Sequence, residues 1–300
     1  MLVDGPRKSV QPHGPRIKTL SIGRICIYVF LISNSLFFLF PIYVMVVTSI
    51  KTMDDIRMGD IFSFPVHHTF APWIKAWSEA CTGRQCEGIS PGFWNSVRIV
   101  VPSVVLSIAG GAINGYALSY WRPKGAEILF GILMLGAFIP YQVFIFPLVQ
   151  VFAKIGLYPS MIAVVTMHTA FGMPLLTLLF RNFYSGLPSE LFKAARIDGG
   201  SFWNIFFYVF FPMSTPVLIV AVILQATGIW NDFIMGLVFA GRENMPMTVL
   251  LNNIVSTTQG EREYNVNMAA TILTAMVPLI IYFLSGKWFV RGIADGAVKG

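Results

Sequence analysis

The sequence predicts an all-α protein that crosses a membrane with about six helices. Of its 300 residues, 55% are hydrophobic and only 12% are charged, whereas a soluble domain carries about a quarter charged residues. The mean hydropathy is +0.69. Several charge-free stretches also exceed the roughly 20 residues that a helix needs to cross a bilayer. Because these stretches are continuously apolar, they indicate buried helices rather than alternating strands.

Six hydrophobic segments follow one another along the chain. The polar stretch 1–22 comes first, and the apolar run behind it is too long for the core of a cleavable signal peptide. We expect the fifth segment to begin at Pro212, where proline interrupts the apolar run, and to extend past Asp232. The sequence therefore predicts one transmembrane domain over 23–291, followed by a short tail, 292–300. The segments are 23–50, 97–121, 127–153, 159–181, 212–240 and 265–290.

The distribution of lysine and arginine predicts the orientation of the chain. Most of the 21 basic residues fall in the N-terminal stretch, in the connections 122–126 and 182–211, and after the last segment. Cytoplasmic connections carry such an excess, so both termini are predicted inside a cell inner (plasma) membrane. The connections predicted outside carry balancing acidic residues. These external connections are 51–96, 154–158 and 241–264.

The three cysteines allow one disulfide. Cys26 lies in the first segment and is expected to be a small packing residue. Cys81 and Cys86 share the predicted external loop, where an oxidising compartment favours a disulfide. Two free thiols are the alternative. No further cysteine or histidine follows at ligand spacing, so we predict no metal site.

Reactive motifs are absent from the sequence, and we therefore predict that the chain is not an enzyme by itself. It has no phosphate-binding loop, no H-E-x-x-H and no G-x-S-x-G. Only Asp232 is expected to be a charged group within the membrane. One carboxylate is too few for a proton relay, which weakens the alternative of a stand-alone secondary carrier or channel.

The internal connection 182–211 predicts a short helical hairpin. Ser189 is expected to cap a helix that runs to Ile197. Asp198 and Gly199 then end this helix, because glycine tolerates the left-handed conformation of a helix stop. A second helix is predicted from Ser201 to Pro212, where the chain re-enters the membrane.

This connection resembles the E-A-A-x-x-x-G loop of permease subunits of ATP-binding-cassette importers. Ala194 and Ala195 match the two alanines, and Gly199 matches the glycine. Pro212 ends the motif at the family's spacing. Lys193 departs from the pattern because it replaces the first glutamate, and we do not carry over that glutamate's role.

Further motifs resemble carbohydrate permeases of the maltose type, and specifically the smaller of the two permeases. The tail reads Gly-Ala-Val-Lys-Gly over 296–300, and Trp230, Asn231 and Asp232 stand together in the fifth segment. Phe93, Trp94, Asn95 and Ser96 precede the second segment, and Pro140 and Pro147 lie in the third.

The resemblance implies a type I importer permease fold that forms half of a sugar-translocation pathway. It also implies a second homologous permease, an external sugar-binding protein and two ATPase subunits that bind ATP and magnesium. We expect the ATPases to contact the cytoplasmic coupling loop 182–211. Its expected coupling residues are Glu190, Lys193, Ala194, Ala195, Asp198 and Gly199.

Two other patterns have open interpretations. Trp230, Asn231 and Asp232 either line a sugar path, because hydroxyls need polar partners and sugar faces suit aromatic rings, or Asp232 is simply solvated near the outer surface. Small residues recur every fourth position in the second segment, a spacing that allows close helix packing. We expect this packing to be within the chain rather than against the second permease. These residues are Ser107, Gly111, Gly115 and Ser119.

Overall fold

The structure, a computed structural model, describes residues 22–83, 85–256 and 262–297. Every regular element in these ranges is a helix. The chain divides into two compact units, Met1–Met45 and Val46–Gly300. The first unit contributes most of helix α1 (Ile22–Ser49), which is 28 residues long and apolar enough to cross a membrane. The second unit contains all the other described helices.

Helices α4 (Ser90–Tyr116) and α7 (Met161–Ser185) form the most extensive helix pair of the second unit. A π-helical turn, η1 (Ala117–Trp121), continues α4. Their backbones approach closely where α4 carries glycine. A Cβ atom on Gly111 would lie 2.6 Å from the Cβ atom of Leu176. The prediction that the small residues serve packing within the chain is therefore confirmed.

The predicted segment 127–153 is broken into two helical parts. Helix α5 (Ala126–Phe138) meets the 3-10 turn η2 (Tyr141–Phe144) and α6 (Ile145–Lys154) at an angle of 93°. Proline explains the break, because it lacks a backbone N–H and disfavours helical geometry in the preceding residue. That residue, Ile139, is extended, with φ −77° and ψ 124°.

The predicted segment 212–240 is also interrupted. Its main helix is α11 (Thr215–Asn231), which follows the short helices α9 (Phe202–Ile205), η3 (Phe206–Phe210) and α10 (Phe211–Met213) after a bend of 79°. The expectation that it continues past Asp232 is wrong. Asp232 has extended backbone angles, φ −67° and ψ 136°, and a separate helix, α12 (Ile234–Phe239), begins beyond it.

The remaining helices lie before α4 and after α12 in the chain. They are α2 (Met53–Met58), α3 (Ala71–Ser78), η4 (Arg242–Asn244), α13 (Met247–Ser256) and α14 (Tyr264–Ala297). The start of α4 is bonded to the segment that precedes α13. The Asn95 amide donates to the carbonyl oxygens of Glu243 and Met245, at 3.0 and 3.2 Å, and the Ser96 hydroxyl accepts from the Met247 N–H at 2.9 Å.

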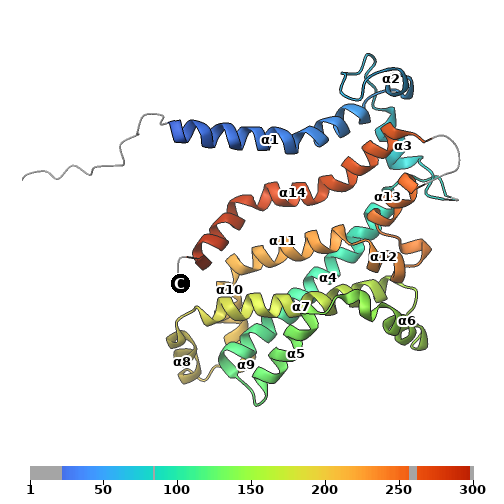
Figure 1. The fold of residues 1–300 in the computed structure, drawn as a ribbon. Helices are drawn as coiled ribbons and strands as arrows, with labels where there is room; N and C mark the ends of the chain where they lie inside the picture. The colour runs from blue at the N-terminus through green and yellow to red at the C-terminus, as the bar shows by residue number, and fades with distance from the viewer. Residues whose placement is uncertain (1–21, 84, 257–261, 298–300) are drawn as a thin grey trace, which may run out of the picture. The chain divides into compact units, whose positions relative to one another are not determined.

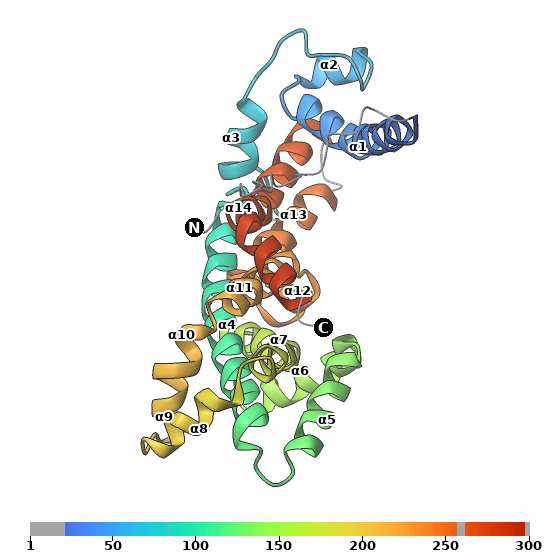
Figure 2. The ribbon, with the colours of Figure 1, turned by 90° about the vertical axis from the view of Figure 1, so that its left-hand side faces the viewer.

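The connections of the second unit gather at two opposite ends. Helices α8 (Ser189–Ile197) and α9 lie at one end, and α3, α12 and α13 lie at the other (Figure 1). Figure 2 shows the first end nearest the viewer, with α8 and α9 leading back to α10. Four described helices are long and apolar enough to cross a membrane, and the number rises to six if each bent pair is one span. The prediction of about six spans is confirmed in this sense.

Candidate functional site

The connection 182–211 forms the predicted helical hairpin at one end of the second unit. Helix α8 ends at Ile197, and Gly199 has a φ of +79°, in the left-handed region expected for the stop. Ser201 then caps α9, because its hydroxyl accepts a hydrogen bond from the Asn204 N–H at 3.3 Å.

The predicted cap of α8 is wrong. The cap of α8 is Pro188, whose φ of −58° and ψ of 127° lead into the helix, and Ser189 is already the first helical residue. The Ser189 hydroxyl donates instead to the Glu190 carboxylate at 3.2 Å. Among the described residues, none donates a hydrogen bond to the Asp198 side chain, so Ser201 alone caps the second helix.

Most of the predicted coupling residues are exposed at this end. Glu190, Lys193, Ala194, Asp198 and Gly199 are exposed, and Ala195 is half-buried. A hydrogen bond from its own backbone N–H lowers the pKa of Glu190, and the Ser189 hydroxyl and the Lys193 charge act in the same direction. Helix α8 therefore presents an ionised acid near its start and basic side chains further along.

Aromatic side chains attach α8 to the membrane-spanning helices. Phe192 stacks on Tyr120 with ring centres 5.0 Å apart, and its edge meets Trp121 at 5.8 Å. The Arg196 guanidinium lies 4.7 Å from the Trp121 ring centre, a cation–π distance. Because Tyr120 and Trp121 belong to η1, these contacts join α8 to the end of α4.

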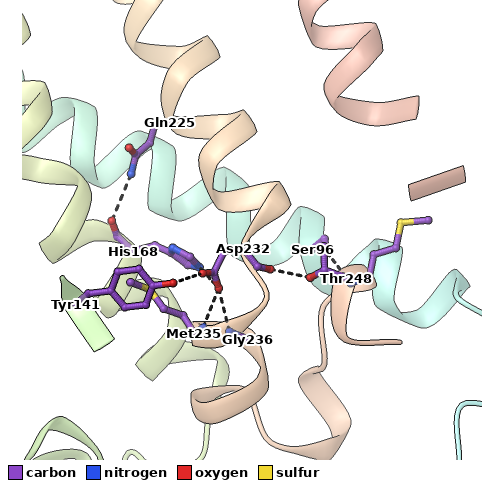
Figure 3. A network of polar contacts seen from close by, with 9 residues as sticks. Ser96, Tyr141, His168, Gln225, Asp232, Met235, Gly236 and Thr248 are labelled. Atoms are coloured by element: carbon purple, nitrogen blue, oxygen red, sulfur yellow. Dashed lines mark hydrogen bonds and ion pairs between the residues drawn. The ribbon is translucent and has the colours of Figure 1, made fainter. Parts of the chain in front are cut away.

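Asp232 is the centre of a polar network at the break between α11 and α12 (Figure 3). Its carboxylate accepts hydrogen bonds from the Tyr141 hydroxyl at 3.2 Å and from the N–H groups of Met235 and Gly236 at 2.9 and 3.2 Å. The Asp232 backbone carbonyl accepts from the Thr248 hydroxyl at 2.7 Å. The side chain is 11% exposed, so the interpretation that it is simply solvated does not fit.

The three residues predicted to line a sugar path occupy different surroundings. Trp230 is 3% exposed, and its indole N–H donates to the carbonyl oxygen of Thr274 at 3.0 Å. Asn231 is exposed, and Asp232 borders two cavities. The larger cavity has a volume of about 210 Å³. The structure therefore places only Asp232 of the three at a cavity.

Sequence reasoning missed three residues that border the larger cavity with Asp232. They are Tyr141, His168 and Gln225. His168 could have been predicted as a candidate site residue, because it is an ionisable residue inside a long apolar segment. Tyr141 follows the proline that breaks its segment, but nothing in the sequence indicates that this break lies beside Asp232.

The remaining site predictions concern the cysteines and metal ions. The structure joins Cys81 and Cys86 by a disulfide bond in the loop between α3 and α4. In the part of the chain that the structure describes, no group of three or more histidine, cysteine or acidic side chains is placed to hold a metal ion.

Known permease proteins are similar to this chain in sequence. A probable permease protein of an ABC transporter from Pyrococcus horikoshii is 32% identical over 285 residues, which cover 95% of this chain and 100% of that one. The melibiose/raffinose/stachyose import permease protein MelC of Bacillus subtilis is 31% identical over 264 residues, covering 87% of this chain and 91% of that one.

A solved structure shares the fold at lower identity. It is the crystal structure of a bacterial ABC transporter involved in the import of the acidic polysaccharide alginate. The match has a TM-score of 0.74 and 21% identity, and it covers 90% of this chain and 98% of that one. Residues 104–295, from the middle of α4 to near the end of α14, match a single family. The chain therefore belongs to the family of binding-protein-dependent transport system inner membrane components.

Proposed function

We propose that this chain is the permease subunit of an ATP-driven sugar importer and forms half of its translocation pathway. The single observation that carries the proposal is the exposed hairpin of α8, which is attached to η1 and α4 through Phe192. A family member of this kind needs an energy source that the chain itself lacks. Relatives such as MelC are named for sugar import, which supports a sugar as the solute.

The proposal assigns the missing functions to partner subunits. Two ATPase subunits bind ATP and magnesium and dock on the α8 hairpin at the cytoplasmic end. A second homologous permease completes the pathway, and an external binding protein delivers the sugar at the end that carries α3, α12 and α13. Closure of the ATPases then moves α8, and the aromatic contacts carry this motion to α4, as a two-state coupling requires.

Co-purification and uptake test the proposal together. The full chain, expressed from its native locus with an affinity tag, is expected to bring an ATPase and a second permease out of the membrane. Cells are then expected to take up a radiolabelled sugar in an ATP-dependent manner, and deletion of this chain abolishes the uptake. A chain that purifies alone, with uptake unchanged by its deletion, would show that it is not an importer subunit.

A further inference from the structure

A cavity lined by both polar and apolar side chains lies where two interrupted segments of the chain meet. The break at Pro140 brings Tyr141 to the cavity, and the break at Asp232 brings the carboxylate. Figure 3 shows Tyr141, His168 and Asp232 pointing toward one another from η2, α7 and the end of α11. Interrupted helices in membrane proteins are tolerated where they line a cavity, and such breaks mark solute sites in some transporters. The cavity of about 210 Å³ is lined by Tyr141, His168, Phe171, Gly172, Gln225, Gly228, Ile229, Asp232 and Met235.

The polar side chains of this cavity have unused hydrogen-bonding capacity. The Asp232 carboxylate accepts three hydrogen bonds, and a carboxylate has about four acceptor positions. The His168 side chain is only 8% exposed, and no residue in the described ranges hydrogen-bonds to its ring. Its Nε2 atom lies 3.9 Å from Oδ2 of Asp232. Because His168 lines the cavity, its ring can hydrogen-bond to a polar molecule that enters there.

Gln225 adds a further acceptor to the same cavity. Its amide nitrogen donates to the backbone carbonyl of His168 at 3.3 Å, and within the described part of the chain no group donates to its amide oxygen. The cavity thus offers acceptors on Asp232 and Gln225 together with an imidazole that can donate or accept. Hydroxyl groups both donate and accept, so a polyhydroxylated solute can satisfy all three.

Apolar groups complete the lining. Phe171 is half-buried with its ring centre 6.0 Å from that of Tyr141, and Met235 also lines the cavity. A sugar ring has C–H faces as well as hydroxyl edges, and an aromatic ring suits such a face. Pockets for drug-sized ligands measure about 300–1,000 Å³, so a cavity of about 210 Å³ has room for one sugar ring.

The charge of the lining selects an uncharged solute. The lining includes the Asp232 carboxylate but no lysine or arginine. An anionic group would meet this carboxylate at low dielectric without a cation to compensate, and such repulsion is an effective basis of discrimination.

We propose that this cavity binds one uncharged sugar ring as the solute passes this subunit. Asp232, Gln225 and His168 hydrogen-bond to its hydroxyls, Tyr141 orients the Asp232 carboxylate and adds its own oxygen, and Phe171 faces the C–H surface. The inference rests on the proposed importer function and adds a sugar contact made by this chain itself.

Substitution of Tyr141 tests the site in cells that carry the complete transporter. Tyr141→Phe keeps the ring against Phe171 and removes only the hydroxyl. Tyr158→Phe, which removes a hydroxyl outside the cavity, is the matched control.

The probes are radiolabelled maltose, melibiose and raffinose. We expect the maximal uptake of the transported sugar to fall about fivefold to tenfold in Tyr141→Phe and to stay unchanged in Tyr158→Phe. ATP hydrolysis stimulated by the loaded binding protein should stay within about twofold in both variants, because delivery and coupling are intact.

A labelling experiment tests the cavity without relying on transport. In a chain with Cys26, Cys81 and Cys86 replaced by serine, Gly228→Cys introduces a thiol at the exposed rim, where a Cβ atom meets nothing within 4 Å. We expect melibiose, maltose or raffinose to slow its reaction with a methanethiosulfonate reagent, and glucuronate to have no effect.

The outcomes separate this inference from the proposed function. If the chain purifies alone and its deletion leaves uptake unchanged, the importer proposal fails, and protection of Gly228→Cys still supports the cavity as a sugar site. If uptake proceeds but Tyr141→Phe equals Tyr158→Phe and no sugar protects the thiol, the subsite is refuted. Equal protection by glucuronate would overturn the selection against anions, and a parallel loss of ATP hydrolysis in Tyr141→Phe would assign Tyr141 to assembly instead.

Discussion

Gly199 determines whether the chain can turn between α8 and α9. Its φ of +79° lies in the left-handed region, and a Cβ atom placed on it would meet nothing within 4 Å. The constraint is therefore conformational rather than steric. Gly186, in the same connection, has a φ of −84°, which a residue with a side chain can also adopt.

Replacing Gly199 with valine is expected to uncouple the transporter without preventing its insertion. The left-handed conformation costs a residue with a side chain about 1–2 kcal/mol, and a β-branched residue is a stronger outlier. The turn then relaxes and displaces α8. Uptake and binding-protein-stimulated ATP hydrolysis should fall together in Gly199→Val, and Gly186→Val should resemble the unmodified protein. Normal transport by Gly199→Val would mean that the hairpin is only a connector.

At the scale of elements, α8 depends on a small aromatic contact for its attachment. Phe192 is half-buried and provides the stacking contact with Tyr120, whereas Phe207 on η3 is 53% exposed and stacks on Trp203. Both phenylalanines belong to the same end of the second unit. Only the first of them joins α8 to another helix.

Truncation of Phe192 is expected to weaken the response of the ATPase to the loaded binding protein. An aromatic pair contributes about 0.5–1.5 kcal/mol beyond its buried area, which corresponds to about a twofold to tenfold change in the docked population. Phe192→Ala should lower stimulated ATP hydrolysis by about this factor, and Phe207→Ala should leave it unchanged. Equal effects of the two variants would contradict a specific role for the stack.

The close pair of α4 and α7 leads to a stability prediction. Gly111→Ala places a Cβ atom 2.6 Å from the Leu176 side chain and 3.0 Å from its backbone carbonyl carbon, so the helices must separate. Overpacking of this kind costs about 1–3 kcal/mol. The detergent-solubilised complex should unfold at a lower temperature, measured at a fixed heating rate. Gly131→Ala on α5, where a Cβ atom meets nothing within 4 Å, is the control and should not lower it.

Local and distant contacts were not equally predictable from the sequence. The hairpin of α8 was predictable because Gly199 and Ser201 act on neighbouring residues. The network of Asp232 was not, because Tyr141 is 91 positions away and reaches it only after a proline break whose direction no local pattern specifies. The surroundings of Trp230 were not predictable for the same reason, since its partner Thr274 is 44 positions further along the chain.

At the scale of the whole second unit, the connections divide between two ends. The α8 hairpin lies at one end, and α3, α12 and α13 lie at the other (Figure 1). The link before α7 belongs with the latter group, because the Ser160 N–H donates to the Phe239 carbonyl at 2.9 Å. This division agrees with the separation of basic from balanced connections along the sequence.

Thiol labelling is expected to decide which end faces the cytoplasm. In the chain without native cysteines, Ser78→Cys on α3 and Ser189→Cys on α8 each replace an exposed serine. An impermeant maleimide should label Ser78→Cys in intact cells and Ser189→Cys only after permeabilisation, because basic connections stay inside. The reverse pattern would overturn the orientation.

The hydrogen bonds that hold the start of α4 have a consequence for biosynthesis. The hydrogen-bond partner of Asn95, Glu243, is synthesised 148 positions later, and that of Ser96, Met247, is synthesised 151 positions later. A ribosome that adds about 5–20 residues per second needs roughly 7–30 s to supply these partners. During this interval α4 and α7 can already pair, whereas the start of α4 still lacks its hydrogen-bond partners. The order of translation therefore makes the end that carries α12 and α13 close later than the α4–α7 pair.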